Sequence, residues 1–186
     1  QRQHLAIATT GLIRGERTLA LAQAIAGFFA VTMATGLTVA ALEWSLTAFG
    51  PDVLVGALPA QPIAYVVPFA FFIMTLRFYI RLPSTIAKIA GAVGVLFGLF
   101  MSGGSFINLT YILAENIPEF IFPLETFWFS AIGSIALPLI VVLIIAAGLG
   151  TPLFLVLGGI AFLLFARTGG VMAVVPNEGY TMLTSN

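Results

Sequence analysis

The chain lacks cysteine altogether and has a single histidine among its 186 residues. Without cysteine it forms no disulfide, no thiolate nucleophile and no cysteine-based metal site. The one histidine, His4, cannot build a histidine cluster, and no acid is placed to orient it beside a serine or threonine. The sequence therefore predicts neither catalytic residues nor a protein metal site, and we expect a protein that is not an enzyme.

Charge is scarce as well. Asp, Glu, Lys and Arg make up 8% of the residues, against about 25% in an ordinary globular domain. A soluble domain with so few charges could not cover its surface with polar side chains. The formal net charge is +0, and the sequence has no run of basic residues that could bind along a phosphate backbone. Both observations argue against a nucleic-acid partner. Hydrophobic residues make up 60% of the chain and the mean hydropathy is +1.12, so we expect a lipid bilayer around it.

Five apolar runs divide the chain. A helix needs roughly 20 apolar residues to cross a hydrocarbon core about 30 Å thick. Four of the runs reach that length, and the last, which precedes Arg167, is shorter and is either broken or continues beyond that residue. The sequence predicts an all-α, polytopic transmembrane protein with about five membrane segments. The segments are 18–42, 61–80, 86–107, 130–149 and 152–166.

The few charges are sorted along the chain. Basic residues gather before the first segment and between the second and third, whereas most acidic residues gather in the other connections. Membrane proteins keep Lys and Arg mainly on the cytoplasmic side, so both basic groups are assigned to the cytoplasm, with Arg167 as the exception. Glu43, at the end of the first segment, is interpreted as an extramembrane residue. The residues assigned to set the topology are Arg14, Arg17, Arg77, Arg81 and Lys88.

Small residues recur at helical spacing in two segments. In lipid, such residues allow close packing of two helices. The first segment has an alanine at every fourth position, and the third has the pair Gly94 and Gly98. We predict the alanine stripe as the main packing face and the glycine pair as the weaker one, although Ala and Gly are abundant throughout the chain. The stripe consists of Ala22, Ala26, Ala30 and Ala34.

Several local patterns have simple structural interpretations. Pro68 and Pro138 each lie inside a segment and predict kinks. Trp44 and Trp128 lie at segment ends, where headgroup contacts are typical of tryptophan. The sequence Ser102-Gly103-Gly104-Ser105 is interpreted as a turn at the end of a segment. Asn108-Leu109-Thr110 matches a glycosylation acceptor, a pattern that also arises by chance.

The stretch from Gly148 to Gly159 combines a glycine-rich turn, Pro152 and a Gly158-Gly159 pair. A short hydrophobic segment interrupted by Gly or Pro is the pattern of a broken helix in secondary transporters. Gly150-Thr151-Pro152-Leu153-Phe154, together with Gly158-Gly159, Phe165 and residues 178–186, resembles the start of the large membrane subunit of tripartite ATP-independent periplasmic (TRAP) transporters.

The first part of the chain is similar to the second half of the small TRAP subunit. The resemblance lies in Gln3-His4-Leu5-Ala6-Ile7, Arg14, Arg17, Leu58-Pro59, Pro62, Tyr65, Pro68, Met74 and Arg77. The family often has an acidic residue shortly after the histidine, where this chain has Ala8. The resemblance implies a small-subunit-like region of two spans at 1–83, a connecting span and extracytoplasmic loop at 84–129, and the start of a large-subunit-like region at 130–186.

The resemblance implies a fragment of a fused, multi-pass transporter in the bacterial inner membrane. Such a transporter imports a small organic acid, a C4-dicarboxylate or a sialic-acid-like compound, with a sodium gradient and an extracytoplasmic binding protein. Its partners would be that binding protein and the remaining transmembrane part of the same transporter. Family residues that bind sodium and substrate would lie mostly beyond Asn186, so no substrate-binding residue is assigned; Thr184, Ser185 and Asn186 are nearest to that region.

A second hypothesis fits the sequence equally well. The absence of charges in the middle of the segments also suits a structural or assembly subunit, a helical integral membrane protein that transports nothing. Because the chain begins with Gln1 rather than methionine, we expect it to be a piece of a longer polypeptide.

Overall fold

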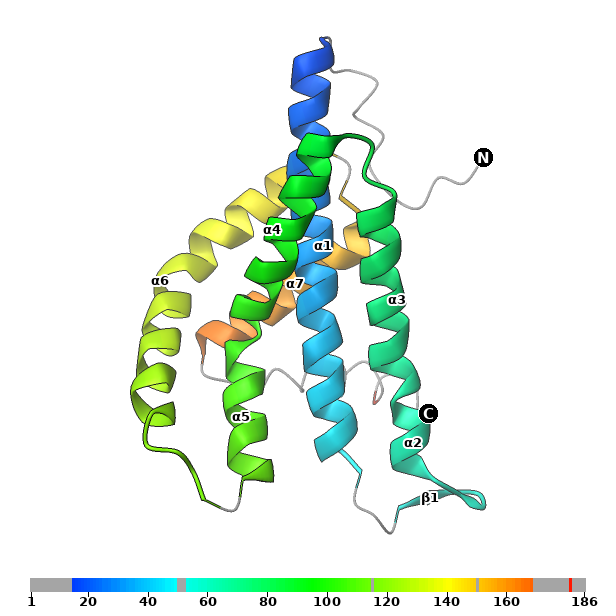
Figure 1. Cartoon of the computed structure of the whole chain (residues 1–186), viewed down its shortest axis with the longest axis vertical. Coiled ribbons are helices and arrows are strands. Elements are labelled where there is room, and N and C mark those ends of the chain that lie inside the picture. The colour runs from blue at the N-terminus through cyan, green and yellow to red at the C-terminus, as the bar shows by residue number, and fades with distance from the viewer. Residues whose placement is uncertain (1–14, 50–52, 115, 150, 169–180, 182–186) are drawn as a thin grey trace.

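A computed structural model describes residues 15–49, 53–114, 116–149, 151–168 and 181 (Figure 1). The described part is helical except for one hairpin of two-residue strands, so the prediction of an all-α protein is confirmed. Gly56 has a φ of 65°, a left-handed conformation that favours glycine, and allows the hairpin turn. The elements are α1 (Glu16–Thr47), β1 (Leu54–Val55), β2 (Leu58–Pro59), α2 (Ala60–Ala64), α3 (Val66–Ile80), α4 (Thr85–Met101), α5 (Gly103–Leu113), α6 (Ile121–Gly148) and α7 (Leu153–Arg167).

Three helical stretches in the described residues are long and apolar enough to cross a membrane: Arg17–Thr47, Ala60–Ile80 and Ile121–Gly148. The pair α4 and α5 passes the same test together, although the two helices are bent by 46°. The last helix, α7, has only 15 residues. The described part therefore contains three such stretches, or four with the bent pair, against about five expected from the sequence.

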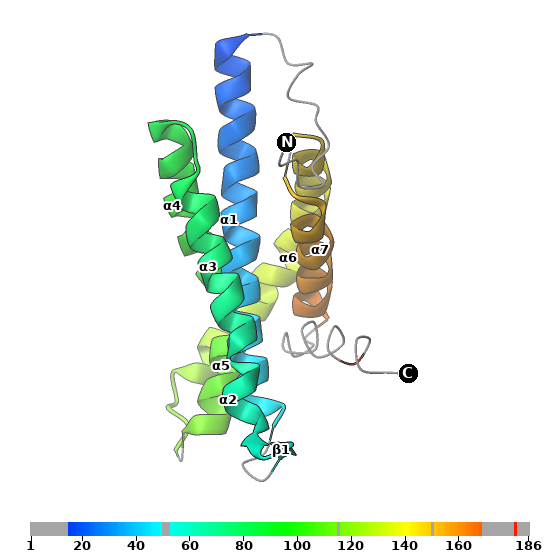
Figure 2. The same cartoon turned by 90° about the vertical axis from the view of Figure 1, so that its right-hand side faces the viewer.

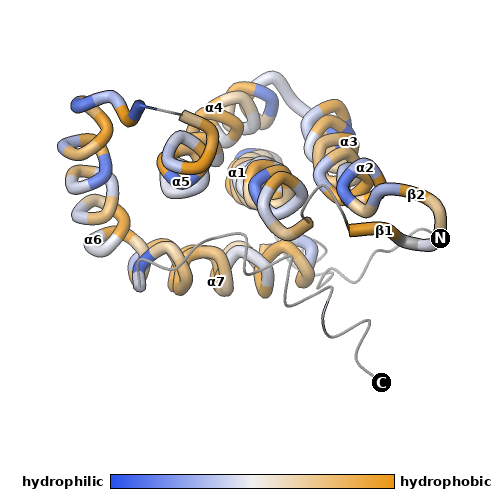
Figure 3. Tube along the Cα trace, turned by 90° about the horizontal axis from the view of Figure 1, so that it is seen from below, coloured by the Kyte–Doolittle hydropathy of each residue, from blue (hydrophilic) through white to orange (hydrophobic). Residues whose placement is uncertain are grey.

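Helix α1 is the centre of the bundle. Of the residues in the apolar window of α1, 72% are buried, compared with 11% in the window of Ala60–Ile80 and 22% in that of α6. Figures 1 and 3 show α3, α4 with α5, and α7 arranged around α1, with α6 on the outer side. Helix α4 runs in the direction of α1 and α3 runs back (Figures 1 and 2), and α7 crosses α1 obliquely (Figures 1 and 3). The apolar faces of α3 and α6 are therefore left for lipid or for other helices.

Two boundaries differ from the sequence prediction. Helix α1 extends to Thr47, beyond the predicted end at residue 42, so Glu43 lies inside a helix. The predicted connection between the segments 86–107 and 130–149 shrinks to 114–120, because α5 continues to Leu113 and α6 begins at Ile121. Pro123 does not prevent this early start, since a proline in the first turn of a helix removes no intrahelical hydrogen bond.

The helix break near Pro68 is compensated by α1. Proline has no amide hydrogen, so Pro68 cannot donate to the carbonyl of Ala64 one turn earlier, and α2 and α3 are separated at Tyr65. The buried Ser45 hydroxyl instead lies 3.1 Å from the Ala64 oxygen and 2.8 Å from the Ala41 oxygen. By contrast, α6 stays one helix through Pro138.

Replacing Ser45 with alanine removes the donor nearest to the Ala64 carbonyl. We expect a loss of about 0.6 kcal/mol, and at most about 1.7 kcal/mol, the range measured for hydrogen bonds between helices in membranes. The measurement is the thermal unfolding midpoint in detergent. The matched control is Ser134→Ala, because the exposed Ser134 hydroxyl bonds only within its own helix, to the Ser130 oxygen at 3.0 Å. Equal losses in the two variants would contradict this role of Ser45.

Helices α1 and α4 pack closely at the glycine pair, which the sequence analysis ranked second. A Cβ on Gly94 would lie 2.8 Å from the Phe28 carbonyl oxygen, and one on Gly98 would lie 2.6 Å from the Thr32 carbonyl oxygen. The Thr32 hydroxyl also donates to the Gly94 oxygen at 3.1 Å. Helices approach this closely only where one of them has no side chain.

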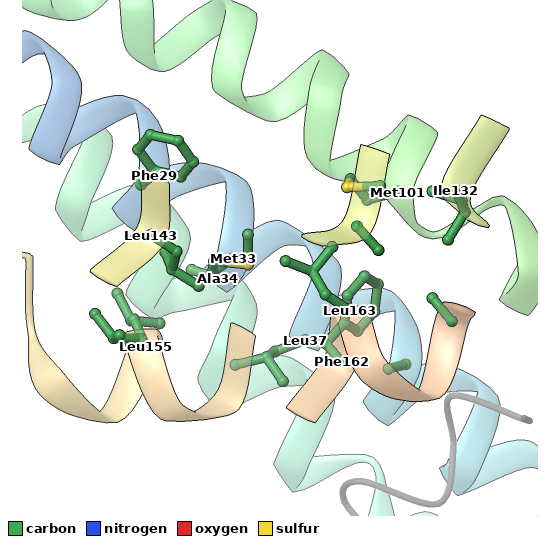
Figure 4. Close-up of a cluster of buried hydrophobic side chains, with 14 of the residues drawn as sticks. Phe29, Met33, Ala34, Leu37, Met101, Ile132, Leu143, Leu155, Phe162 and Leu163 are labelled. Atoms are coloured by element: carbon green, nitrogen blue, oxygen red, sulfur yellow. The ribbon is translucent and has the colours of Figure 1, made fainter. Parts of the chain in front are cut away.

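The alanine stripe lies within the same bundle, at another contact. Ala22, Ala30 and Ala34 are buried and Ala26 is partly exposed. Ala30 and Ala34 belong to the main apolar core, which α1 shares with α6 and α7 (Figure 4). In this core Leu143, Leu155, Phe162 and Leu163 surround Met33, Ala34 and Leu37 (Figure 4).

Candidate functional site

Glu43 is an ionisable residue inside the bundle. It lies one turn before the end of α1, has a relative exposure of 0%, and accepts a hydrogen bond from the Asn108 side-chain amide at 2.5 Å. Glu43 therefore lies within the helix and within the packed bundle, whereas the sequence analysis had placed it after the end of the first segment.

Asn108 is partly buried and belongs to a polar row on the bent helix pair. Ser102, Ser105 and Asn108 are three residues apart, so they follow one side of the helix. Ser102 and Ser105 both have 0% exposure. The Ser102 hydroxyl donates to the Gly98 oxygen at 2.8 Å, whereas the Ser105 oxygen has no hydrogen-bond partner in the described part of the chain. Polar groups buried inside the bundle are costly unless they are paired or bind something.

The bend that presents this row is fixed by Trp128. Its indole nitrogen donates to the Phe100 carbonyl at 2.8 Å, just before the bend. A Cβ on Gly103 would lie 2.4 Å from the same nitrogen, so the indole fits only against a glycine. The predicted turn is thus confined to Ser102, at the bend between α4 and α5, and Gly103 to Ser105 form the start of α5.

The two tryptophans are buried, at 4% exposure for Trp44 and 3% for Trp128. Trp44 packs with Ala64 and with the ring of Phe49. Both rings are therefore covered by protein in the described structure and are not exposed as headgroup anchors. Each ring instead fills the space between α1 and α2 or between the bend and α6.

The asparagine of the glycosylation match lies within a helix. Asn108 is partly buried in α5, and its side-chain amide donates to Glu43. In the described structure Asn108 therefore forms a contact between α5 and α1.

A side-chain hydrogen bond connects α5 and α6 at the end of the bundle, beyond the polar row. The Tyr111 hydroxyl donates to the Glu125 carboxylate at 2.6 Å. Between these helices lies a cavity of about 330 Å³. Its lining is apolar apart from Thr110 and Trp128, whose polar groups are bonded to the Phe106 and Phe100 carbonyls. The cavity therefore has no group that would bind a charged substrate.

The basic residues named from the sequence lie at the opposite end. Arg17 is exposed in the first turn of α1, and Arg77, Arg81 and Lys88 are exposed around the α3–α4 turn. Arg167 is exposed at the end of α7. Arg14, His4 and Thr184, Ser185 and Asn186 lie outside the described residues. The structure thus brings Arg77, Arg81 and Lys88 together around one turn. None of the described residues is assigned to substrate binding.

The sequence analysis missed the Glu43–Asn108 pair. A signal for Asn108 was present, because it stands between Ile107 and Leu109 in a run that continues as helix. For Glu43 the signal was weaker: Trp44-Ser45-Leu46-Thr47 has two polar residues, which do not by themselves distinguish a continuing helix from a loop. Serine and threonine can remain in such a helix by donating to the carbonyl one turn earlier, as Thr47 does to Glu43 at 2.9 Å.

Comparisons of the chain with family models, with curated proteins and with solved structures found no match. Within the described residues, no group of three or more metal-binding side chains comes together.

Proposed function

We propose that the chain is a membrane component of a TRAP-type secondary transporter in the bacterial inner membrane. In this proposal it helps to import a small organic acid, either a C4-dicarboxylate or a sialic-acid-like compound, with a sodium gradient and an extracytoplasmic binding protein. The observation that carries it is the contact between the buried Glu43 of α1 and the partly buried Asn108 of the bent α4–α5 pair. Ionisable residues inside membrane helices are expensive and characteristically line ion or substrate pathways.

The short helix α7 supports the same proposal. It begins after Thr151, which is buried and whose hydroxyl lies 3.5 Å from the Ala26 carbonyl of α1. Its Gly158 and Gly159 face Leu37 and Met33, and a Cβ on Gly159 would come within 2.6 Å of the Met33 sulfur. A short, glycine-interrupted helix tightly packed against a long one is compatible with the broken-helix construction of secondary transporters.

The proposal assigns the chain a supporting role. Residues 1–83 and 130–186 would represent parts of the small and large subunits, and 84–129 the connection between them. The α4 part of that connection packs along α1 through Gly94 and Gly98, so it would belong to the scaffold. No residue is assigned to substrate binding.

A second candidate is a structural or assembly subunit without transport activity. The observation that favours it is the large apolar surface left on α3 and α6, of which Phe69, Phe72, Val141 and Ile145 are exposed. Such faces suit contact with the helices of another subunit as well as with lipid.

Uptake into proteoliposomes separates the two functions. The complete protein that contains the chain is reconstituted with a candidate binding protein, and labelled succinate and N-acetylneuraminate are offered separately. We expect uptake of one of them only with an inward sodium gradient and only with its binding protein. The controls are vesicles with potassium in place of sodium and vesicles without the binding protein. Uptake of neither substrate, with the protein correctly inserted and bound to a partner subunit, would favour the assembly subunit.

A further inference from the structure

We propose that the α3–α4 turn is a binding surface for anionic phospholipids, with Arg77, Arg81 and Lys88 as the groups that bind the headgroup phosphates. This proposal requires that the chain lies in a membrane but does not depend on transport. It differs from the topology role assigned from the sequence, because it concerns a contact in the folded protein.

The three basic side chains have no counter-ion in the described structure. All three are exposed, and none forms an ion pair or a side-chain hydrogen bond within the described part of the chain. The neighbouring sequence offers no counter-ion, since it contains no Asp or Glu between Asp52 and Glu115. Arg77 and Arg81 are one helical turn apart, a spacing at which like charges destabilise a helix. An anion bound between them would offset that repulsion.

The three basic residues lie at the end of α3 and the start of α4, on either side of one short turn. The Arg81 amide donates to the Arg77 oxygen at 3.2 Å, and the Lys88 amide donates to the Ser84 oxygen at 2.9 Å. Ser84 also caps α4 by accepting from the Ala87 amide at 3.2 Å. A Cβ on Gly91 would lie 2.5 Å from Leu82, so α4 packs tightly against the turn. The amino end of α4 adds the positive end of its helix dipole to the same surface.

Apolar side chains beside the turn indicate which kind of anion binds. Ile80, Ile86 and Ile89 are 63%, 65% and 61% exposed, and Leu76 is also exposed. A soluble anion would gain nothing from these side chains, whereas the acyl chains of a phospholipid would cover them. Basic residues at the membrane surface attract anionic lipids with an energy that adds up over the residues. The combination of unpaired cations and adjacent exposed isoleucines therefore selects an anionic phospholipid.

The test compares two lipid environments. The protein is reconstituted in nanodiscs of phosphatidylcholine alone or of an equimolar mixture with phosphatidylglycerol, and thermal unfolding is followed by tryptophan fluorescence. We expect the mixture to raise the midpoint by roughly 6 to 12 °C, the scale set by three surface cations. The triple variant R77Q/R81Q/K88Q should lose most of this rise. The matched control Arg167→Gln removes an exposed cation at the end of α7 and should keep it.

Two further measurements keep the proposal open to refutation. If the triple variant does not fold, native mass spectrometry of the unsubstituted protein and of the double variant R81Q/K88Q should show fewer phosphatidylglycerol adducts on the variant. Inorganic phosphate added to the phosphatidylcholine nanodiscs should leave the midpoint unchanged. Equal midpoints in the two lipids, a rise that survives the triple substitution, or an equal rise with phosphate would overturn the lipid surface.

Discussion

Replacing Gly98 with alanine should lower the thermal unfolding midpoint by about 2 to 12 °C, which corresponds to about 1 to 3 kcal/mol of overpacking in a chain of this size. The added methyl group would lie 2.6 Å from the Thr32 carbonyl oxygen and 2.7 Å from the Thr35 Cβ atom. The first of these atoms is backbone, so it cannot turn aside as a flexible side chain would. Helices α1 and α4 would have to move apart, and the hydrogen bond from Thr32 to the Gly94 oxygen would be weakened with them.

The matched control is Gly133→Ala on α6, where an added Cβ meets nothing within 4 Å. Alanine favours helix more than glycine by up to about 1 kcal/mol, so this variant should keep or raise the midpoint. Both variants add the same methyl group to a helix and differ only in what it meets. A Gly98→Ala midpoint equal to that of Gly133→Ala would show that α1 and α4 are not in contact at Gly98.

Small-residue spacing predicted helix packing but did not identify the partner helix of each stripe. The sequence ranked the alanines of α1 above the Gly94–Gly98 pair, because a longer repeat looks like a stronger signal. Alanine still has a Cβ, whereas glycine lets a carbonyl of the neighbouring helix replace it, as Phe28 and Thr32 do here. Which face of α1 contacts which helix depends on the packing of the whole bundle, so it cannot be predicted from the sequence of one segment.

Helix ends were the least predictable part of the fold. The all-α class and the approximate positions of the helices follow from apolar length alone. The ends of α1 and α5 do not, since Glu43 and Asn108 are polar residues just beyond the predicted segment ends. In the folded chain the Asn108 side-chain amide donates to the Glu43 carboxylate. Such partners come from distant parts of the chain, so the candidate site could be identified only in the folded structure.

Replacing Glu43 with alanine should destabilise the protein by about 2 to 5 kcal/mol, the range for truncating a large buried side chain. Part of this loss comes from the Asn108 amide, a partly buried donor that would no longer have its acceptor. Glu43→Gln should cost less, because its side-chain oxygen can still accept from Asn108. The measurement is the thermal or denaturant unfolding midpoint in detergent, where a loss of this size lowers the thermal midpoint by roughly 4 to 20 °C.

A double-mutant cycle separates this pair from general loss of packing. Glu43→Ala, Asn108→Ala and the double variant should show a coupling of about 0.6 kcal/mol or more, because removing both partners leaves no unpaired group. Glu119→Ala is the matched carboxylate control, since Glu119 is exposed in the loop before α6 and surface substitutions usually stay within about 0.5 kcal/mol. Strict additivity of the two single losses would mean that Glu43 and Asn108 do not interact. With coupling present and Glu119→Ala neutral, the carboxyl is held by α5, and any movement of the bend at Ser102 must change the environment of Glu43.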